Sequence, residues 1–301
     1  MIDLSLIIVS YNTAGLTCDC LESVLAADPG GRELFVIDNA STDGSAGRIE
    51  ERFPAVRLIA NTRNRGFSAA NNQAIPQCRG RYLFFLNPDT RVRPDAFTRA
   101  VSFMDQNPQI GLAGCRMVNP DGTPQESVSC RYPGQKHCRG ELGSLPGRIA
   151  CVLGAAMIAR TGLIRNLGGF DEDFFLYGED QDLALRIRQS GFEIGFIPDA
   201  VVVHYGGKSE SPANPIAMWE KKVRAEDIFY RKHYRPETIR RIRRAELLKA
   251  AWRRATLRLA LPFAKDREKV RAKLIRYETI ARVTGLLTEE ERSGRGGKSA
   301  E

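Results

Sequence analysis

The chain has 301 residues with 43% hydrophobic content, enough for one large α/β domain with appendages or for two small domains. No stretch approaches the ~20 consecutive apolar residues that span a bilayer, and no basic segment precedes the apolar residues 4–9. We therefore expect no signal peptide and a cytoplasmic protein. Seven cysteines without a CxxC spacing predict reduced thiols. A zinc site of Cys130, His137 and Cys138 is an alternative with an incomplete ligand set.

The net charge of +9 is distributed unevenly along the chain. Residues 221–283 hold 21 Lys and Arg against 7 Asp and Glu, a net charge of +14. Residues 284–301 carry a net charge of −1, which leaves −4 for residues 1–220. The basic pI therefore describes a C-terminal extension and not the expected active domain.

The first 120 residues alternate between apolar runs and helical patterns. Strands are expected at 4–10, 33–37, 56–60, 82–86 and 110–118, and helices at 16–27, 45–53, 68–77 and 94–107. Alternation with short loops predicts a parallel, doubly wound sheet flanked by helices. We expect this Rossmann-like, mostly parallel α/β domain to occupy residues 1–215.

The second half of the chain is less regular. Residues 119–148 are rich in Pro, Gly and charge, and we expect an irregular insertion or flap, often the place for substrate-specific contacts. A strand at 151–159, a helix at 179–190 and short strands at 193–197 and 200–204 complete the domain. Helical sequence interrupted by prolines predicts a basic α-helical extension over 216–287, followed by a disordered tail over 288–301.

The basic extension allows three interpretations: a solvated surface packed on the domain, an anionic membrane surface bound through 240–283, or a nucleic-acid partner. An apolar stripe that includes Trp252 runs between the arginines. This stripe favours a membrane over nucleic acid, so we expect no nucleic-acid partner. A peripheral position on the inner face of the cell membrane follows from the membrane interpretation.

Carboxylates follow two of the expected strands. Asp89 closes the sequence Leu-Asn-Pro-Asp after the buried run 82–86, at the edge where open α/β sheets bind ligands. It is either a turn cap or a ligand of Mg²⁺ or Mn²⁺, with Asn87 as a poorer ligand beside it. Asp38 ends the strand at 33–37 and is either an Asx-turn residue or a contact of a nucleotide base.

An acidic helix start and a histidine supply the remaining candidates. Glu179 and Asp180 begin a helix, where carboxylates serve either the helix dipole or general-base catalysis. Asp182 points elsewhere, and we expect it to cap the helix or to pair with Arg186. His204 ends an apolar strand and is on its own more often structural than functional.

Taken together, these motifs resemble the family 2 glycosyltransferases, in particular the rhamnosyltransferase-type members. The matching segments cover about residues 1–210. They are SLIIVSYN at 5–12, VIDNASTDGS at 36–45, NRGF at 64–67 continuing to Asn71, LNPD at 86–89, GGFD at 168–171, GEDQDL at 178–183 and HYGGKS at 204–209. The resemblance implies a GT-A nucleotide-diphospho-sugar transferase fold.

The resemblance also implies roles for individual residues. The expected nucleotide-binding residues are Ser10, Tyr11, Asn12, Asp38, Asn64, Gly66 and Asn71. Asp89 resembles the last acid of the family's Asp-x-Asp metal motif, and His204 resembles its second metal ligand. Asn87 stands where the family has the first acid, which removes one carboxylate from the expected Mg²⁺ or Mn²⁺ site. Asp180 resembles the catalytic base, with Glu179 shaping the acceptor site.

The implied activity is that of an inverting, metal-dependent hexosyltransferase. The expected donor is dTDP-L-rhamnose, and the expected acceptor is a bacterial surface glycan, as in polysaccharide biosynthesis, carried on a polyprenyl diphosphate. A UDP-hexose, UDP-N-acetylhexosamine or galactofuranose donor is the alternative within the family, and a catalytically degenerate binding subunit is another. Neither a pyrophosphorylase nor a dehydrogenase is favoured, because the first strand is followed by no Gly-rich phosphate loop.

Overall fold

The computed structural model describes residues 2–27, 31–206 and 214–293. The chain divides into two compact units: a sheet unit of residues 1–132 and 145–211, and a helical unit of residues 133–144 and 212–301. Two expectations lie outside the described residues, namely the end of the HYGGKS motif at 207–209 and the last part of the tail at 294–301.

The sheet unit contains ten strands and six α-helices within its described ranges. The strands are β1 (Leu4–Ser10), β2 (Arg32–Asp38), β3 (Arg57–Ala60), β4 (Tyr82–Leu86), β5 (Thr90–Val92), β6 (Ile110–Val118), β7 (Val128–Ser129), β8 (Cys151–Val152), β9 (Ala156–Arg160) and β10 (Glu193–His204). The helices are α1 (Ala14–Ala26), α2 (Ser45–Arg52), α3 (Gly66–Ala74) with the 3₁₀ turn η1 (Ile75–Gln77), α4 (Ala96–Gln106), α5 (Thr161–Asn166) and α6 (Glu179–Gln189).

Eight strands form one mixed sheet in the order β3-β2-β1-β4-β9-β6-β10-β5. The expected parallel pairs hold for β1 with β2 and β4, β2 with β3, and β6 with β10. Strand β9 instead runs antiparallel to β4 and β6, and β5 runs antiparallel to β10. These two strands are antiparallel because no crossover helix precedes β5 or β9, and the mostly parallel sheet expected from the sequence allows for them.

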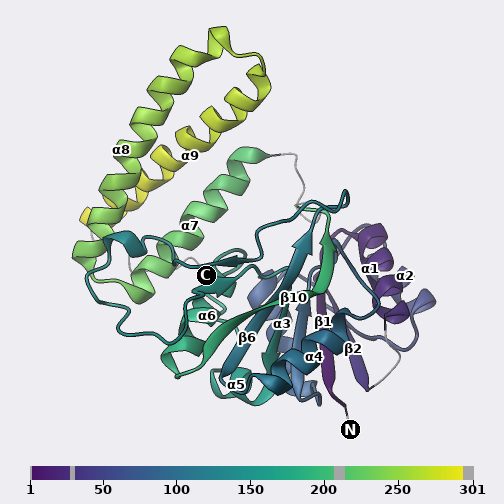
Figure 1. Cartoon of the computed structure of the whole chain (residues 1–301). Coiled ribbons are helices and arrows are strands. Elements are labelled where there is room, and N and C mark those ends of the chain that lie inside the picture. Colours follow the sequence, from purple (N-terminus) through teal and green to yellow (C-terminus); the bar gives the residue numbers. More distant parts are fainter. Residues whose placement is uncertain (1, 28–30, 207–213, 294–301) are drawn as a thin grey trace. The chain divides into compact units, whose positions relative to one another are not determined.

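Helices cover both faces of this sheet (Figure 1). Alternate residues of β1, Leu4, Leu6 and Ile8, share one core cluster with side chains of α1, α2 and α4. Ile7 and Phe85 point to the other face and are fully buried, and Phe85 lies edge-on to Phe170 with ring centroids 4.9 Å apart. Burial on both faces explains why the strands read as unbroken apolar runs in the sequence.

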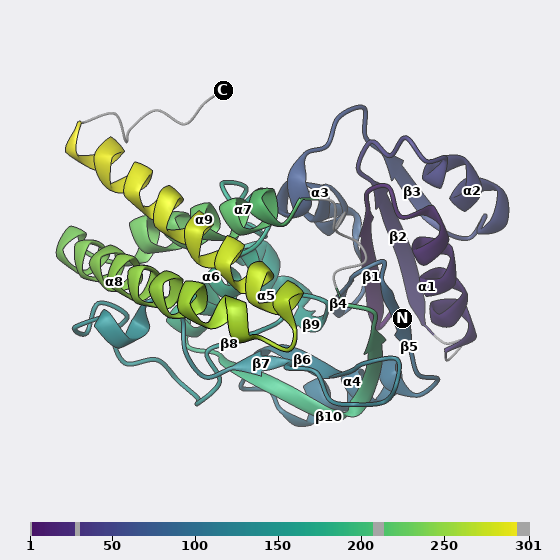
Figure 2. The ribbon, with the colours of Figure 1, turned by 90° about the horizontal axis from the view of Figure 1, so that it is seen from above.

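The helical unit consists of α7 (Pro215–His233), α8 (Pro236–Ala260), η3 (Leu261–Phe263) and α9 (Arg267–Arg292), with the turn η2 (Gln135–His137). Helices α8 and α9 lie side by side in both views (Figures 1 and 2). Pro236 begins α8 and Pro262 lies in η3, where the sequence predicts interruptions. Helix α9 ends at Arg292, so the disorder expected from residue 288 is wrong for 288–292. None of the helices in the described ranges is long and apolar enough to cross a membrane.

The segment expected as one insertion at 119–148 is divided between the two units, because residues 133–144 are held by α7 and α8. The Tyr234 hydroxyl donates to the carbonyl of Pro133 at 2.7 Å, and the Thr238 hydroxyl donates to Glu141. Gly134 adopts a φ of +68° against Ile242, where a Cβ would collide with that side chain. This loop is therefore built into the helical unit.

Candidate functional site

The carboxyl ends of β1, β2 and β4 meet at one edge of the sheet. Parallel pairing sets Ser10 opposite Asp38 and Ile8 opposite Leu86. Asp38, the last residue of β2, and Asp89, in the loop after β4, therefore lie on the same edge. This is the position where open α/β sheets bind ligands, as the sequence predicts.

Strand β5, which the sequence pattern did not predict, brings Asp89 to His204. Antiparallel pairing of β5 with β10 places His204 opposite Thr90, and the backbone N–H of Tyr205 donates to the Asp89 carbonyl at 3.0 Å. The His204 Nε2 lies 3.6 Å from the Asp89 Oδ1, and the Asp89 side chain is fully buried. The pair expected to share a metal ion is thus brought together.

Gln125 fixes the orientation of the His204 ring. Its amide nitrogen donates to the His204 carbonyl at 2.7 Å and to the Asn119 side-chain oxygen at 2.6 Å. Its oxygen, which only accepts, must then take the hydrogen bond from the His204 Nδ1 at 2.9 Å. The Nδ1 therefore carries a proton, and in the neutral ring the lone pair of Nε2 faces Asp89.

A chain of backbone contacts links the Asp89 loop to Asp180. The N–H of Asn87 donates to the carbonyl of Ala155 at 2.9 Å, and the N–H of the adjacent Gly154 donates to the Asp180 carboxylate at 3.1 Å. Antiparallel pairing of β9 with β4 aligns Ala156 with Leu86 and creates this arrangement. The two acidic motifs, about ninety residues apart in sequence, therefore converge.

Asp180 is the second residue of α6 and is partly buried. Burial raises the pKa of its carboxyl to about 6, although the N–H groups of Gln181 and Gly154 donate to it and oppose the shift. A carboxylate with this pKa is about nine-tenths ionised at pH 7. Its pKa lies close enough to that pH for the group to act as a general base.

The other two acids of this motif differ in their surroundings. Glu179 is buried beside Asp180 at the start of α6. Asp182 forms an ion pair with Arg186, with an N–O distance of 2.7 Å, which confirms the expected pairing. Of the three acids, Asp180 is the one that the Gly154 N–H links to the Asp89 loop.

Asp38 fits both of its interpretations. Its Oδ2 accepts a hydrogen bond from the Ser41 N–H at 3.0 Å, as an Asx-type turn requires. Its Oδ1 is buried and has no hydrogen-bond partner among the described residues. Asn12, at a φ of +52°, accepts from the Thr42 N–H at 2.7 Å and holds the neighbouring loop, while Tyr11 is exposed.

Two expected nucleotide-binding residues use their side chains inside the protein. The Ser10 hydroxyl is buried and bonds Thr13 and Thr17 at 3.0 and 2.9 Å. The Asn71 amide donates to the carbonyl of Phe67 at 2.9 Å within α3. Both side chains therefore have a structural role beside the carboxyl ends of the strands.

Asn64 and Gly66 are connected to Asp38 through Asn39, a residue to which the sequence pattern assigns no role. Asn39 donates to the Asn64 side chain at 2.8 Å and to the Gly66 carbonyl at 3.2 Å. Gly66 has a φ of +79°, and a Cβ there would lie 2.5 Å from the carbonyl oxygen of Phe175. Gly66 thus permits the close approach of the segment that leads to Asp180.

Asn39, Gln125 and Gly154 act through long-range contacts, and no sequence motif assigns a role to any of them. Gln125 lies in the irregular segment without periodicity, so only the folded chain reveals its place. Within the described ranges, no group of three or more His, Cys, Asp or Glu side chains is arranged to hold a metal ion. Asp89 and His204 would together supply only two ligands, so a metal ion bound there would need further ligands from a substrate or from water.

Comparisons with known proteins show what this chain is similar to. The model of the family described as glycosyl transferase family 2 matches residues 5–165. N-acetylglucosaminyl-diphospho-decaprenol L-rhamnosyltransferase of Mycobacterium tuberculosis is 26% identical over 222 residues, which cover 63% of this chain and 72% of that protein.

Two solved structures share the fold. The mannosyltransferase PcManGT from Pyrobaculum calidifontis, in complex with GDP-Man and Mn²⁺, superposes with a TM-score of 0.62 at 20% identity and covers 96% of this chain and 87% of its own. S. aureus TarS 1-349, in complex with UDP-GlcNAc, gives a TM-score of 0.54 at 16% identity, with coverages of 97% and 92%. The GT-A fold expected from the sequence is confirmed. With more than half of its residues matched by the family model, the chain belongs to glycosyl transferase family 2.

Proposed function

We propose that the protein transfers a sugar from a nucleotide donor to a hydroxyl group of a bacterial glycan carried on a polyprenyl diphosphate. L-rhamnose from dTDP-L-rhamnose is the first candidate, supported by the rhamnosyltransferase relative. A UDP-N-acetylhexosamine donor is the second, favoured by the fold shared with TarS in its UDP-GlcNAc complex. The observation that carries the proposal is the convergence of Asp180 with the Asp89–His204 pair at one sheet edge.

The proposed reaction is a direct displacement with inversion. Asp180 removes the proton from the acceptor hydroxyl, whose oxygen then attacks the anomeric carbon of the donor sugar. The bond from that carbon to the nucleoside diphosphate breaks, and the diphosphate leaves with the electron pair. Asp38 contacts the base through its buried Oδ1, while Asn64 and Gly66 lie near the ribose and diphosphate.

The Asp89–His204 pair fits a divalent cation. The Nε2 lone pair of the neutral ring faces a carboxylate oxygen at 3.6 Å, which is too long for a hydrogen bond, and a cation bound to both atoms would offset the repulsion between them. Oxygen and imidazole nitrogen are ligands that Mn²⁺ accepts, and oxygen is the ligand that Mg²⁺ prefers. The half-buried Asn87 is near enough in sequence to be a third ligand. When bound, the metal would supply Lewis-acid stabilisation of the leaving diphosphate.

Gln125 is expected to control this site by holding the His204 tautomer. Replacing Gln125 by Leu removes all three of its side-chain hydrogen bonds and should weaken Mn²⁺-supported nucleotide binding by about 10–100-fold. Gln125→Glu keeps the acceptor for Nδ1 and should retain more of the affinity. Titration of nucleoside diphosphate with and without Mn²⁺ measures both. Equal weakening of metal-free binding in Gln125→Leu would show a merely structural role.

A membrane position suits a lipid-linked acceptor. Trp252 and Phe263 of the helical unit are 70% and 88% exposed, and Leu259 between them is 75% exposed. Cationic residues flank them, among them Arg253, Arg258 and Lys265. Exposed aromatic side chains among Lys and Arg are typical of protein surfaces that bind anionic bilayers. We therefore place the protein in the cytoplasm at the inner face of the membrane.

A donor panel tests the proposal. The purified full-length protein is incubated with dTDP-L-rhamnose, UDP-hexoses and UDP-N-acetylhexosamines, with an acceptor-lipid extract and with Mn²⁺, Mg²⁺ or chelator. Metal-dependent release of dTDP from dTDP-L-rhamnose is the expected result. Release of UDP alone would favour the second candidate, a UDP-N-acetylhexosamine donor. A protein that binds no nucleotide in the presence of metal would instead support the degenerate subunit that Asn87 suggests.

A further inference from the structure

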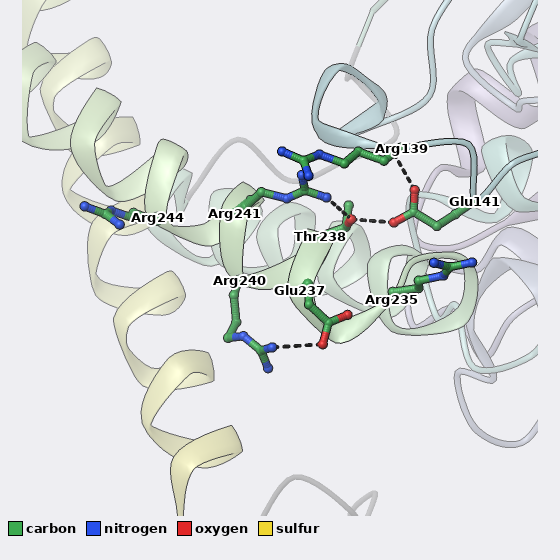
Figure 3. Close-up of a pocket in the computed structure, with 8 residues that line it drawn as sticks. All are labelled: Arg139, Glu141, Arg235, Glu237, Thr238, Arg240, Arg241 and Arg244. Carbon is green, nitrogen blue, oxygen red and sulfur yellow. Dashed lines mark hydrogen bonds and ion pairs between the residues drawn. The ribbon is translucent and has the colours of Figure 1, made fainter.

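We propose that the helical unit carries a separate binding site for a phosphate or diphosphate group, in the arginine-rich pocket at the start of α8. The pocket has a volume of about 470 Å³ and is lined by Arg139, Arg235, Arg240, Arg241 and Arg244 (Figure 3). All of its lining residues belong to the helical unit. The proposal does not rest on the donor, acceptor or mechanism proposed above.

The pocket has more positive than negative charge. Its lining contains five arginines and two glutamates, a formal excess of three positive charges. Glu237 is paired with Arg240 at 3.1 Å. Within the described residues, the guanidinium groups of Arg139, Arg235 and Arg244 form no ion pair. An excess of positive charge around one hollow favours a bound anion.

One side of the pocket is organised by hydrogen bonds that leave its guanidinium groups available. Glu141 accepts from the Arg139 backbone N–H at 2.5 Å and from the Thr238 hydroxyl. The Thr238 oxygen in turn accepts from Arg241 at 2.6 Å. The carboxylate of Glu141 is thus occupied by a backbone and a hydroxyl donor, and Thr238 holds Arg241 in place.

Arg241 has an unused donor inside the structure. Its Nε is buried and has no hydrogen-bond partner among the described residues. Figure 3 shows the guanidinium groups of Arg139 and Arg241 extending into the same part of the pocket. The first turn of the 25-residue helix α8 also lines it, and this end of a helix favours negative charge.

These features identify the chemical class of the ligand. Planar guanidinium groups bind phosphate oxygens through paired, charge-assisted hydrogen bonds. A terminal phosphate carries about 1.5 to 2 negative charges at pH 7, and a second phosphate group adds to this. A diphosphate therefore matches the excess of three positive charges better than a singly charged phosphodiester does.

The test is calorimetric titration of the full-length, metal-free protein with inorganic pyrophosphate. We expect Arg139→Gln/Arg241→Gln to weaken binding about tenfold or more. Arg139→Gln/Arg244→Gln keeps the Arg241–Thr238 bond and gives the same answer if the first variant folds poorly. The matched control is Arg271→Gln/Lys273→Gln, which removes two exposed charges outside the pocket and should leave binding unchanged.

Titrations with other ligands identify the source of the phosphate group. Farnesyl diphosphate bound more tightly than pyrophosphate, with the same loss in the pocket variants, would assign the site to a lipid-linked diphosphate. Equal affinities would assign it to soluble phosphate compounds. The proposal is overturned if the wild type binds no pyrophosphate, or if the control pair loses as much affinity as the pocket variants. It is also overturned if the pocket variants lose only their binding to phosphatidylglycerol vesicles, since the pocket would then sense membrane charge alone.

Discussion

Replacing Asp180 by Asn is expected to lower sugar transfer by about 10²–10⁴-fold, the usual contribution of a positioned base. The amide keeps the size of the side chain and accepts from the Gly154 N–H, so nucleotide binding should persist. The wild-type kcat/KM should rise with pH and level off above a midpoint near 6, where the carboxyl loses its proton. Stopped assays of sugar transfer between pH 5 and 8 measure this rise of kcat/KM.

The control for this variant is Glu172→Gln, the same chemical change in the preceding segment. Its carboxylate oxygen accepts a hydrogen bond from Asn72 at 3.0 Å, which an amide oxygen can still accept. We expect turnover close to wild type. If Asp180→Asn keeps its turnover, Asp180 is not the base.

The raised pKa of Asp180 also has a thermodynamic consequence. Burial favours the protonated carboxyl, so the ionised form destabilises the fold as the pH rises through about 6. We expect Asp180→Asn to raise the free energy of unfolding by about 1–3 kcal/mol at pH 8 and to change it little at pH 4. Stabilisation at high pH together with lost turnover is the signature of a functional acid.

Replacing Asp89 by Asn should lower metal-dependent turnover by about 10²–10³-fold, because Lewis-acid stabilisation of a leaving group contributes several kcal/mol. The carboxylate is fully buried 3.6 Å from the His204 Nε2, and an amide supplies no negative charge there. Unlike Asp180→Asn, this variant should also lose the gain in nucleotide affinity that Mn²⁺ gives to the wild type. Titrations with and without Mn²⁺ separate the two variants.

Asp95→Asn is the matched control for Asp89→Asn. Asp95 lies six residues further on and forms an exposed ion pair with Arg99 at 2.5 Å, an interaction of small value. The control should bind metal and nucleotide as the wild type does. Undiminished Mn²⁺ dependence in Asp89→Asn would remove Asp89 from the metal site.

Local patterns in the sequence predict most elements of the sheet unit. Strand β1 agrees with the expected residues 4–10, and α6 begins at Glu179 as expected. The sequence pattern does not predict the antiparallel direction of β9, because periodicity indicates burial and not the direction of a neighbouring strand. Strand β5 is only three residues long, too short for a pattern, although its pairing with β10 creates the Asp89–His204 contact.

The motifs identify the central side chains of the site but not those that support them. Asp89, Asp180 and His204 are found from the sequence because their types and positions carry chemistry. Gln125 and Asn39 are polar residues in loops, and their role depends on partners 79 and 25 residues away. Long-range contacts of this kind are set by the fold and leave no local signal.

The most direct test of the central claim is the anomeric configuration of the transferred sugar, read by NMR on the product of the active donor in the panel. A single displacement with Asp180 as base places the acceptor oxygen on the face opposite the departing diphosphate. The account therefore predicts a product whose anomeric configuration is inverted relative to the donor. A product with retained configuration would require a second displacement and would contradict the role given to Asp180.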